Sequence, residues 1–330
     1  MKTKINVTQL CMDDGDRQRR WEEDRRHPMQ YFKNRFQWFK YPLWHYVAPF
    51  PLHVDFEVTS RCNLSCPMCF RRNFENEQEF TDMDIELFKK GVDECAGNDL
   101  YSIRLSWRGE STLHPRILEM IRYAKEAGIQ EVSFLSNGSA LSEEFCMGLI
   151  ESGLDYITIS VDALKDKYNE LRKPLDFEET VSNISRLYSI KEAHGGGFPK
   201  VKVQGIYEYF KGRVREYYET FKPITDNVSF NIRHDYELQS VEQEDQLFCP
   251  YLWQRITVTA NGLVPICISD WDLDEPVADL NRDTIRDIWH GQKMEALRKM
   301  HLANNRLQLK PCRKCYRTKT ATVEEVFDWE

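Results

Sequence analysis

The chain has 330 residues with 41% hydrophobic content, including 18 Phe, 15 Tyr and 8 Trp, enough for one large domain or a large and a small one. Its 45 Lys and Arg and 53 Asp and Glu give a net charge of −8, which argues against nucleic-acid binding by the whole protein. The sequence begins with no apolar stretch and contains no long apolar run. We therefore expect no signal peptide, no membrane span and a cytoplasmic location.

Residues 1–50 are expected to form a basic and aromatic N-terminal arm. Its basic side chains outnumber the acidic ones, and aromatic side chains lie between them: Arg17, Arg19, Arg20, Arg25, Arg26, Lys33, Arg35 and Lys40 against Glu22, Glu23 and Asp24, with Trp21, Tyr31, Phe32, Phe36, Trp38, Phe39, Tyr41, Trp44 and Tyr46. We expect the aromatics to pack on the main domain while the charges stay solvated. A surface for a phosphate-bearing substrate, a carrier or a membrane face is the alternative.

From residue 53 the sequence alternates strand-like and helix-like segments. Strands are expected at 53–58, 101–107, 131–136, 155–161, 200–206 and 227–233, and helices around 85–92, 117–128, 142–152, 177–193 and 213–222. Six strands separated by helices at this rhythm indicate an α/β fold with a parallel sheet. In parallel barrels the chemistry lies on the loops that follow the strands, at their carboxyl ends.

Three cysteines lie in a C-x3-C-x2-C spacing directly after the first expected strand: Cys62, Cys66 and Cys69. The ten cysteines of the chain are clustered, which indicates metal ligation in a reducing compartment. Iron–sulfur clusters usually take four cysteine thiolates, so a loop that offers three leaves one iron open to a non-protein ligand. Structural cysteines or a zinc site are the alternatives, but zinc sites with three protein ligands favour histidine, and the loop has none.

This loop resembles that of the radical S-adenosylmethionine (SAM) superfamily. The resemblance implies a [4Fe–4S] cluster on the three catalytic cysteines, whose open iron chelates the amino and carboxylate groups of SAM. It implies that an electron from the cluster splits SAM into methionine and a 5'-deoxyadenosyl radical, which abstracts hydrogen from the substrate. It further implies a partial (β/α)6 TIM barrel over residues 51–238 and an external one-electron reductant such as flavodoxin or ferredoxin.

The sequence Arg108-Gly109-Glu110 follows the second expected strand. It resembles the Gly-Gly-Glu-type motif of the superfamily, with arginine in place of the first glycine. By this resemblance Glu110 would bind the SAM ammonium through a charge-assisted hydrogen bond, with Arg108 and Gly109 beside it. The replacement puts the local backbone in question, because arginine does not adopt positive φ as freely as glycine.

Polar residues also mark the ends of the later strands. Ser136-Asn137-Gly138 is similar to a Thr-Asn-Gly sequence found there in many relatives, although Asn-Gly is also a common turn dipeptide. By resemblance Ser160 and Asp162 lie near the SAM ribose or the substrate, and Arg172 pairs with the SAM carboxylate. Gln204 on the fifth strand faces an interior that would otherwise be apolar, which is typical of a ligand contact.

Four further cysteines lie in the last segment, residues 239–330: Cys249, Cys267, Cys312 and Cys315. Residues 256–267 predict a β-hairpin that turns at Asn261-Gly262, and a helical stretch follows. This tail resembles the SPASM/Twitch domains of radical SAM enzymes. A full SPASM domain has more cysteines for two clusters, so four fit the Twitch form with one fully ligated auxiliary [4Fe–4S] cluster. A four-cysteine zinc site is the alternative.

A fully ligated auxiliary cluster is suited to electron transfer. After hydrogen abstraction from a carbinol carbon, the substrate must lose a proton and one more electron to become a carbonyl. The cysteine spacing is similar to that of Twitch aminocyclitol dehydrogenases, which implies oxidation of a secondary alcohol in a sugar or aminocyclitol, free or carrier- or nucleotide-linked. Epimerisation or dehydration of a sugar, modification of a ribosomally made peptide, and a non-catalytic scaffold or electron carrier stay open as alternatives.

Overall fold

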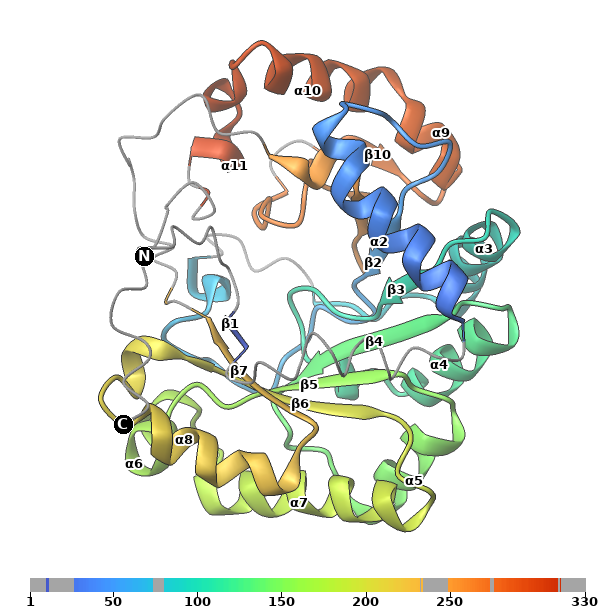
Figure 1. Ribbon diagram of the computed structural model, residues 1–330. Helices are drawn as coiled ribbons and strands as arrows, with labels where there is room; N and C mark the ends of the chain where they lie inside the picture. Colours follow the sequence, from blue (N-terminus) through green and yellow to red (C-terminus); the bar gives the residue numbers. More distant parts are fainter. Residues whose placement is uncertain are drawn as a thin grey trace.

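The computed structural model describes residues 10–11, 27–73, 80–231, 233, 249–273, 276–313 and 315. Within these ranges one eight-stranded sheet runs in the order β1-β7-β6-β5-β4-β3-β2-β8 (Figure 1). The strands from β7 to β8 are parallel to their neighbours, and the short edge strand β1 is antiparallel to β7. Their bounds are Leu10–Cys11 for β1, His53–Phe56 for β2, Ser102–Arg104 for β3, Glu131–Ser136 for β4, Tyr156–Ser160 for β5, Lys200–Ile206 for β6, Asn227–Asn231 for β7 and Arg255–Val258 for β8.

Helices follow the strands from β2 to β6 and cover the sheet, as the alternating sequence predicts. They are α3 (Ile85–Gly97), α4 (Ile117–Glu126), α5 (Glu143–Glu151), α6 (Lys165–Leu171), α7 (Phe177–Ala193) and α8 (Val214–Phe221). Figure 1 shows α5, α7 and α8 along one side of the sheet. Alternate residues of β4 and β6 are buried against this layer, which is the period-two pattern of a strand with one covered face. The partial TIM barrel is therefore confirmed. The short helix α6 was not predicted.

The C-terminal segment contains α9 (Ile285–His290), α10 (Gln292–Leu302) and α11 (Lys310–Arg313), with a small strand pair of β9 (Leu263–Val264) and β10 (Ala278–Asp279). The predicted turn at Asn261-Gly262 is present, with Gly262 at φ +89° and its N–H bonded to the Thr259 carbonyl at 2.9 Å. The prediction that the two strands on either side of this turn pair with each other is wrong. β8 pairs in parallel with β2, and β9 pairs with β10. Three of the four β8 residues are buried, as in a strand covered on both faces.

The N-terminal arm contains a 16-residue helix, α2 (Pro28–Leu43), while its predicted basic residues from Arg17 to Arg26 lie outside the described ranges. The expectation that its aromatics pack on the barrel holds for Trp38, whose ring meets that of His53 edge-on at 6.2 Å. It is wrong for Phe36 and Phe39, which are 52% and 64% exposed. The physical reason is that only one side of a helix can contact the sheet.

None of the helices in the described ranges combines the length and the apolar character that crossing a bilayer requires.

Cys95 on α3 and Cys146 on α5 belong to neither of the two cysteine sets, and both are fully buried among core side chains. They are packing residues.

Candidate active site

The first cysteine loop begins at the carboxyl end of β2, where the sequence places it. Cys66 is buried and Cys62 and Cys69 are half-buried, and the Cys69 N–H bonds to the Cys66 carbonyl at 3.0 Å in a tight turn. Burial, opposed by the charge of Arg172, raises the pKa of the Cys66 thiol to about 11. Burial also raises the pKa of Cys69. The Cys66 and Cys69 thiols thus stay protonated at neutral pH unless they coordinate a metal, which deprotonates them.

Gly109 lies where the loop and the second strand end meet. A Cβ there would lie 2.6 Å from the Arg61 carbonyl oxygen and closer still to that of Thr59. The Glu110 N–H bonds to the same Arg61 carbonyl at 2.8 Å. The backbone of the Arg-Gly-Glu motif is therefore packed directly on the chain that leads into Cys62, and only glycine fits at this position.

The backbone at Arg108, which stands where the superfamily motif has its first glycine, is compatible with arginine. Its φ is not positive in the structure, so this position does not need glycine. Its guanidinium forms a bidentate ion pair with Glu57, from Nε to Oε1 and from Nη2 to Oε2, each at 2.7 Å. Arg108 is 8% exposed and Glu57 is fully buried. The side chain of Arg108 is thus engaged with the barrel interior. The partner, Glu57 on the chain just after β2, was not identified from the sequence.

Glu110 is brought together with the two predicted residues of the third strand end. Its carboxylate accepts hydrogen bonds from the Ser136 hydroxyl at 2.8 Å and from the Asn137 backbone N–H at 2.7 Å. Thr112, which the sequence analysis missed, donates its hydroxyl to Glu110 at 2.7 Å. Burial raises the pKa of Glu110, and these donors counter that shift. The Asn137 amide also donates to the Asn63 side chain of the cysteine loop at 2.7 Å, so the three strand ends form one connected site.

Asp162 and Arg172 pair with each other. The Arg172 Nε donates to Asp162 Oδ2 at 2.6 Å, and Nη2 lies 2.5 Å from the same oxygen. The charge of Arg172 acts on the Cys66 thiol, which places this pair beside the cysteine loop. Ser160 and Gln204 are register partners on the neighbouring strands β5 and β6, and both are half-buried. These predicted residues share the edge of the sheet at which the cysteine loop lies.

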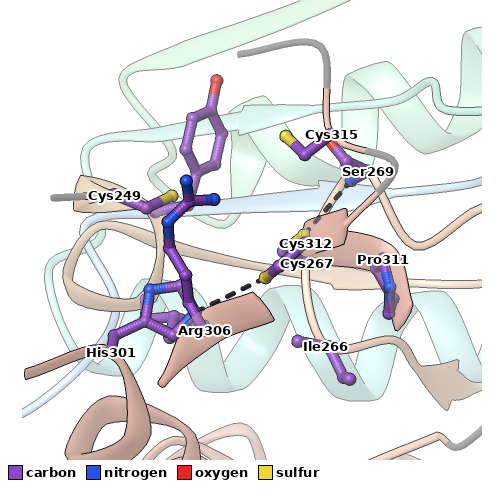
Figure 2. A pocket seen from close by; sticks show the side chains of 11 residues that line it. Cys249, Ile266, Cys267, Ser269, His301, Arg306, Pro311, Cys312 and Cys315 are labelled. Atoms are coloured by element: carbon purple, nitrogen blue, oxygen red, sulfur yellow. Dashed lines mark hydrogen bonds between the residues drawn. The ribbon is translucent and has the colours of Figure 1, made fainter. Parts of the chain in front are cut away.

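The four C-terminal cysteines line one pocket, which Figure 2 shows. The other lining residues are Tyr251, Leu252, Ile266, Ser269, His301, Arg306 and Pro311. The Ser269 N–H donates to the Cys267 sulfur at 3.4 Å, and His301 Nε2 lies 3.6 Å from the Cys312 sulfur. Burial, followed by the neighbouring Cys249 and Cys315, raises the pKa of Cys312 to about 12.

This donor set fits an iron–sulfur cluster. Four cysteine thiols are the ligands that a [4Fe–4S] cluster takes, and hydrogen bonds to the sulfurs tune its potential. Burial and the charge of Arg306 lower the pKa of His301 to about 4, so its ring is neutral and carries one N–H, which can donate to the Cys312 sulfur. His301 and Arg306 were not predicted.

The two cysteine sites are joined by the segment that follows Cys267. The Trp107 indole N–H donates to the Ile268 carbonyl at 2.9 Å, and Arg108 donates to the Trp271 carbonyl at 3.3 Å. The Trp271 ring stacks on that of Phe70, directly after Cys69, with centroids 4.9 Å apart. The Arg-Gly-Glu motif therefore contacts both cysteine-bearing segments: Gly109 and Glu110 contact the chain that leads into Cys62, and Arg108 contacts the segment after Cys267.

Two family models match the chain. Residues 56–202 match the Radical SAM superfamily, and residues 249–316 match SPASM, an iron–sulfur cluster-binding domain. Among curated relatives, the tungsten-containing aldehyde ferredoxin oxidoreductase cofactor-modifying protein of Pyrococcus furiosus is 34% identical over 156 residues, 47% of this chain and 43% of that protein. The GTP 3',8-cyclase of Chlorobaculum tepidum is 32% identical over 137 residues, 41% of this chain and 40% of that protein. The chain thus spans less than half the length of either relative.

Solved structures share the fold over most of the chain. BtrN in complex with AdoMet and 2-DOIA has a TM-score of 0.56 at 18% identity, covering 80% of this chain and 92% of its own. The anSMEcpe protein with bound AdoMet has a TM-score of 0.60 at 16% identity, covering 83% and 92%. SuiB of Streptococcus suis bound to S-adenosylmethionine has a TM-score of 0.59 at 13% identity, covering 94% and 83%. At these identities the likeness establishes the fold.

Proposed function

Because the chain belongs to the radical SAM superfamily and carries an SPASM iron–sulfur domain, we propose that it oxidises a secondary alcohol of a small sugar or aminocyclitol, free or carrier- or nucleotide-linked. When bound, SAM and the two clusters supply the 5'-deoxyadenosyl radical that removes one hydrogen atom and the acceptor that takes the remaining electron. The first electron comes from an external reductant such as flavodoxin or ferredoxin. The alcohol loses two hydrogens in all: one ends on 5'-deoxyadenosine and the other leaves as a proton.

The observation that carries this proposal is the contact between the two cysteine sites. The segment after Cys267 bonds to the side chains of Trp107 and Arg108, and Trp271 stacks on Phe70 beside Cys69. An electron acceptor is useful only if it is held rigidly near the place where the substrate loses its electron. The four-cysteine pocket supplies every ligand of a cluster from the protein, which suits electron transfer better than substrate binding.

The residues of the first site take the following roles in this proposal. The Glu110 carboxylate holds the SAM ammonium, and Ser136 and Asn137 orient that carboxylate. Gly109 lets the backbone lie against the cysteine loop. Arg172, held by Asp162, would pair with the SAM carboxylate, and Ser160 and Gln204 on the neighbouring strands would contact SAM or the substrate.

The test is a product assay with the reconstituted protein, SAM, a one-electron reductant and a panel of sugars and aminocyclitols. The expected result is a ketone two mass units below the substrate, formed in equal amount with 5'-deoxyadenosine. When the substrate carries deuterium on the carbinol carbon, the deuterium should appear in 5'-deoxyadenosine. Cys315→Ala should still cleave SAM but give no ketone, because its second electron has no acceptor. A product of unchanged oxidation level, made equally well by Cys315→Ala, would contradict the oxidation and favour epimerisation or dehydration.

A further inference from the structure

Helix α2 carries an exposed apolar stripe. Met29 is 76% exposed, Phe36 52%, Phe39 64% and Leu43 65%, and Phe32 between them is 40% exposed. These five residues are separated by three, four, three and four positions, a spacing that places them on one side of the helix. At a rise of about 1.5 Å per residue the stripe is about 21 Å long. Large apolar surfaces of this kind usually mark an interaction site.

The opposite side of α2 is fixed to the barrel. Asn34 is buried, and its amide donates to the Leu52 carbonyl at 3.3 Å. The Gln254 amide donates to the Trp38 carbonyl at 2.9 Å, and the Arg255 guanidinium lies 4.9 Å from the Trp38 ring centroid. Figure 1 shows α2 across the end of the sheet that carries β2 and β3. The helix is therefore held in place, and the stripe faces outward because the inward side is already in use.

Charge decides between the possible occupants of this stripe. Residues 27–46 contain no acidic side chain, whereas Lys33 and Lys40 are exposed beside the stripe, in a chain with a net charge of −8. Two copies of α2 packed face to face would place four lysines in one interface with no acidic side chain of residues 27–46 to pair with them, which is unfavourable. The complementary partner is anionic.

The chemistry of the stripe favours a lipid surface over an acidic peptide. One side of a single helix is convex, so it offers no groove for a peptide, whereas a bilayer surface accepts a convex apolar face. Trp44 and Tyr46, 59% and 47% exposed, extend the stripe beyond the helix end. Tryptophan and tyrosine concentrate at membrane–water interfaces, and helices with an apolar aromatic side flanked by lysine lie in that plane. We propose that α2 docks this protein on an anionic membrane surface without crossing it.

The test uses the full-length holoprotein and vesicles of phosphatidylcholine, with and without phosphatidylserine, in a sedimentation assay. The wild type should bind the anionic vesicles and lose affinity as salt rises. Phe36→Ser/Phe39→Ser should lower the affinity about tenfold or more, since it removes two large apolar side chains from the contact. Lys33→Gln/Lys40→Gln should weaken binding to anionic vesicles and leave the weak binding to neutral ones unchanged. The matched control is Leu302→Ser, which removes a 45% exposed leucine from α10.

Circular dichroism and iron content check that each variant is folded and loaded. Absence of wild-type binding to the anionic vesicles overturns the proposal. So does equal loss of binding in the Leu302 control. A third contradicting result is a concentration-dependent dimer in light scattering that the Phe36/Phe39 variant abolishes, because the stripe would then be an interface between copies.

Discussion

Replacing Arg108 by methionine tests the contact that we place at the centre of the two-site arrangement. The change keeps most of the length of the side chain and removes the guanidinium from Glu57, with which it forms two hydrogen bonds of 2.7 Å. Glu57 is fully buried and would keep the Ala260 backbone N–H, at 3.1 Å, as a hydrogen-bond donor. Removing one partner of a buried ion pair costs about 3–5 kcal/mol, because a buried charge is left uncompensated. Arg108→Met should therefore lower the free energy of unfolding by about that amount.

The assay is denaturant unfolding of the holoprotein, followed by the absorbance of the clusters and by circular dichroism. Arg215→Met is the matched control, because Arg215 pairs with Glu219 on the surface with 72% and 61% of the side chains exposed. Exposed pairs contribute less than about 1 kcal/mol. The double variant Glu57→Gln/Arg108→Met should recover a large part of the loss, since it removes the unpaired charge. A loss no larger than that of the control, or no recovery in the double variant, would show that the Arg108–Glu57 pair does not stabilise the fold in this way.

Three further predictions concern the first site. Glu110→Gln should weaken SAM binding about tenfold or more in calorimetry, because it replaces a charged acceptor with a neutral one; unchanged affinity would remove Glu110 from the SAM site. Burial raises the pKa of Glu110, so this carboxyl ionises less readily in the folded state than in the unfolded state. The wild type therefore loses stability as pH rises from the ordinary glutamate range through the raised pKa. The unfolding free energy of Glu110→Gln relative to wild type should therefore increase over that pH interval, and a flat difference would argue against a raised pKa. Gly109→Ala should destabilise the protein by about 1–3 kcal/mol and reduce iron retention, because the new methyl group meets two backbone oxygens. Gly97→Ala, with no heavy atom nearby, is its control and should retain iron fully.

The sequence predicted those parts of the fold and the site that local patterns encode. Alternating burial on β4 and β6 follows from the period of a strand, and the C-x3-C-x2-C loop lies within eight positions of the chain. The position of Glu110 beside Ser136 and Asn137 follows from a general property of parallel sheets, whose carboxyl ends meet at one edge. The grouping of these three residues could therefore be predicted from the sequence.

The parts that were missed depend on contacts between distant segments. β8 pairs with β2 across about 200 residues, and the turn at Asn261-Gly262 suggested a local partner instead. The Glu57 partner of Arg108 is 51 positions away, so the arginine looked like an irregular motif position. Likewise, nothing local marks His301 as a neighbour of Cys312, and the side of α2 that faces solvent is decided by what Trp38 and Asn34 touch.

We infer that one chain holds two separate clusters, one on each cysteine set. The decisive measurement is the iron and sulfide content per chain after anaerobic reconstitution, in the wild type and in the Cys62/Cys66/Cys69→Ala variant. We expect about eight irons in the wild type and about four in the variant, since each cubane holds four. About four irons that fall to none, with zinc retained in both proteins, would contradict it: the C-terminal cysteines would then hold a structural metal and could not accept an electron from the substrate.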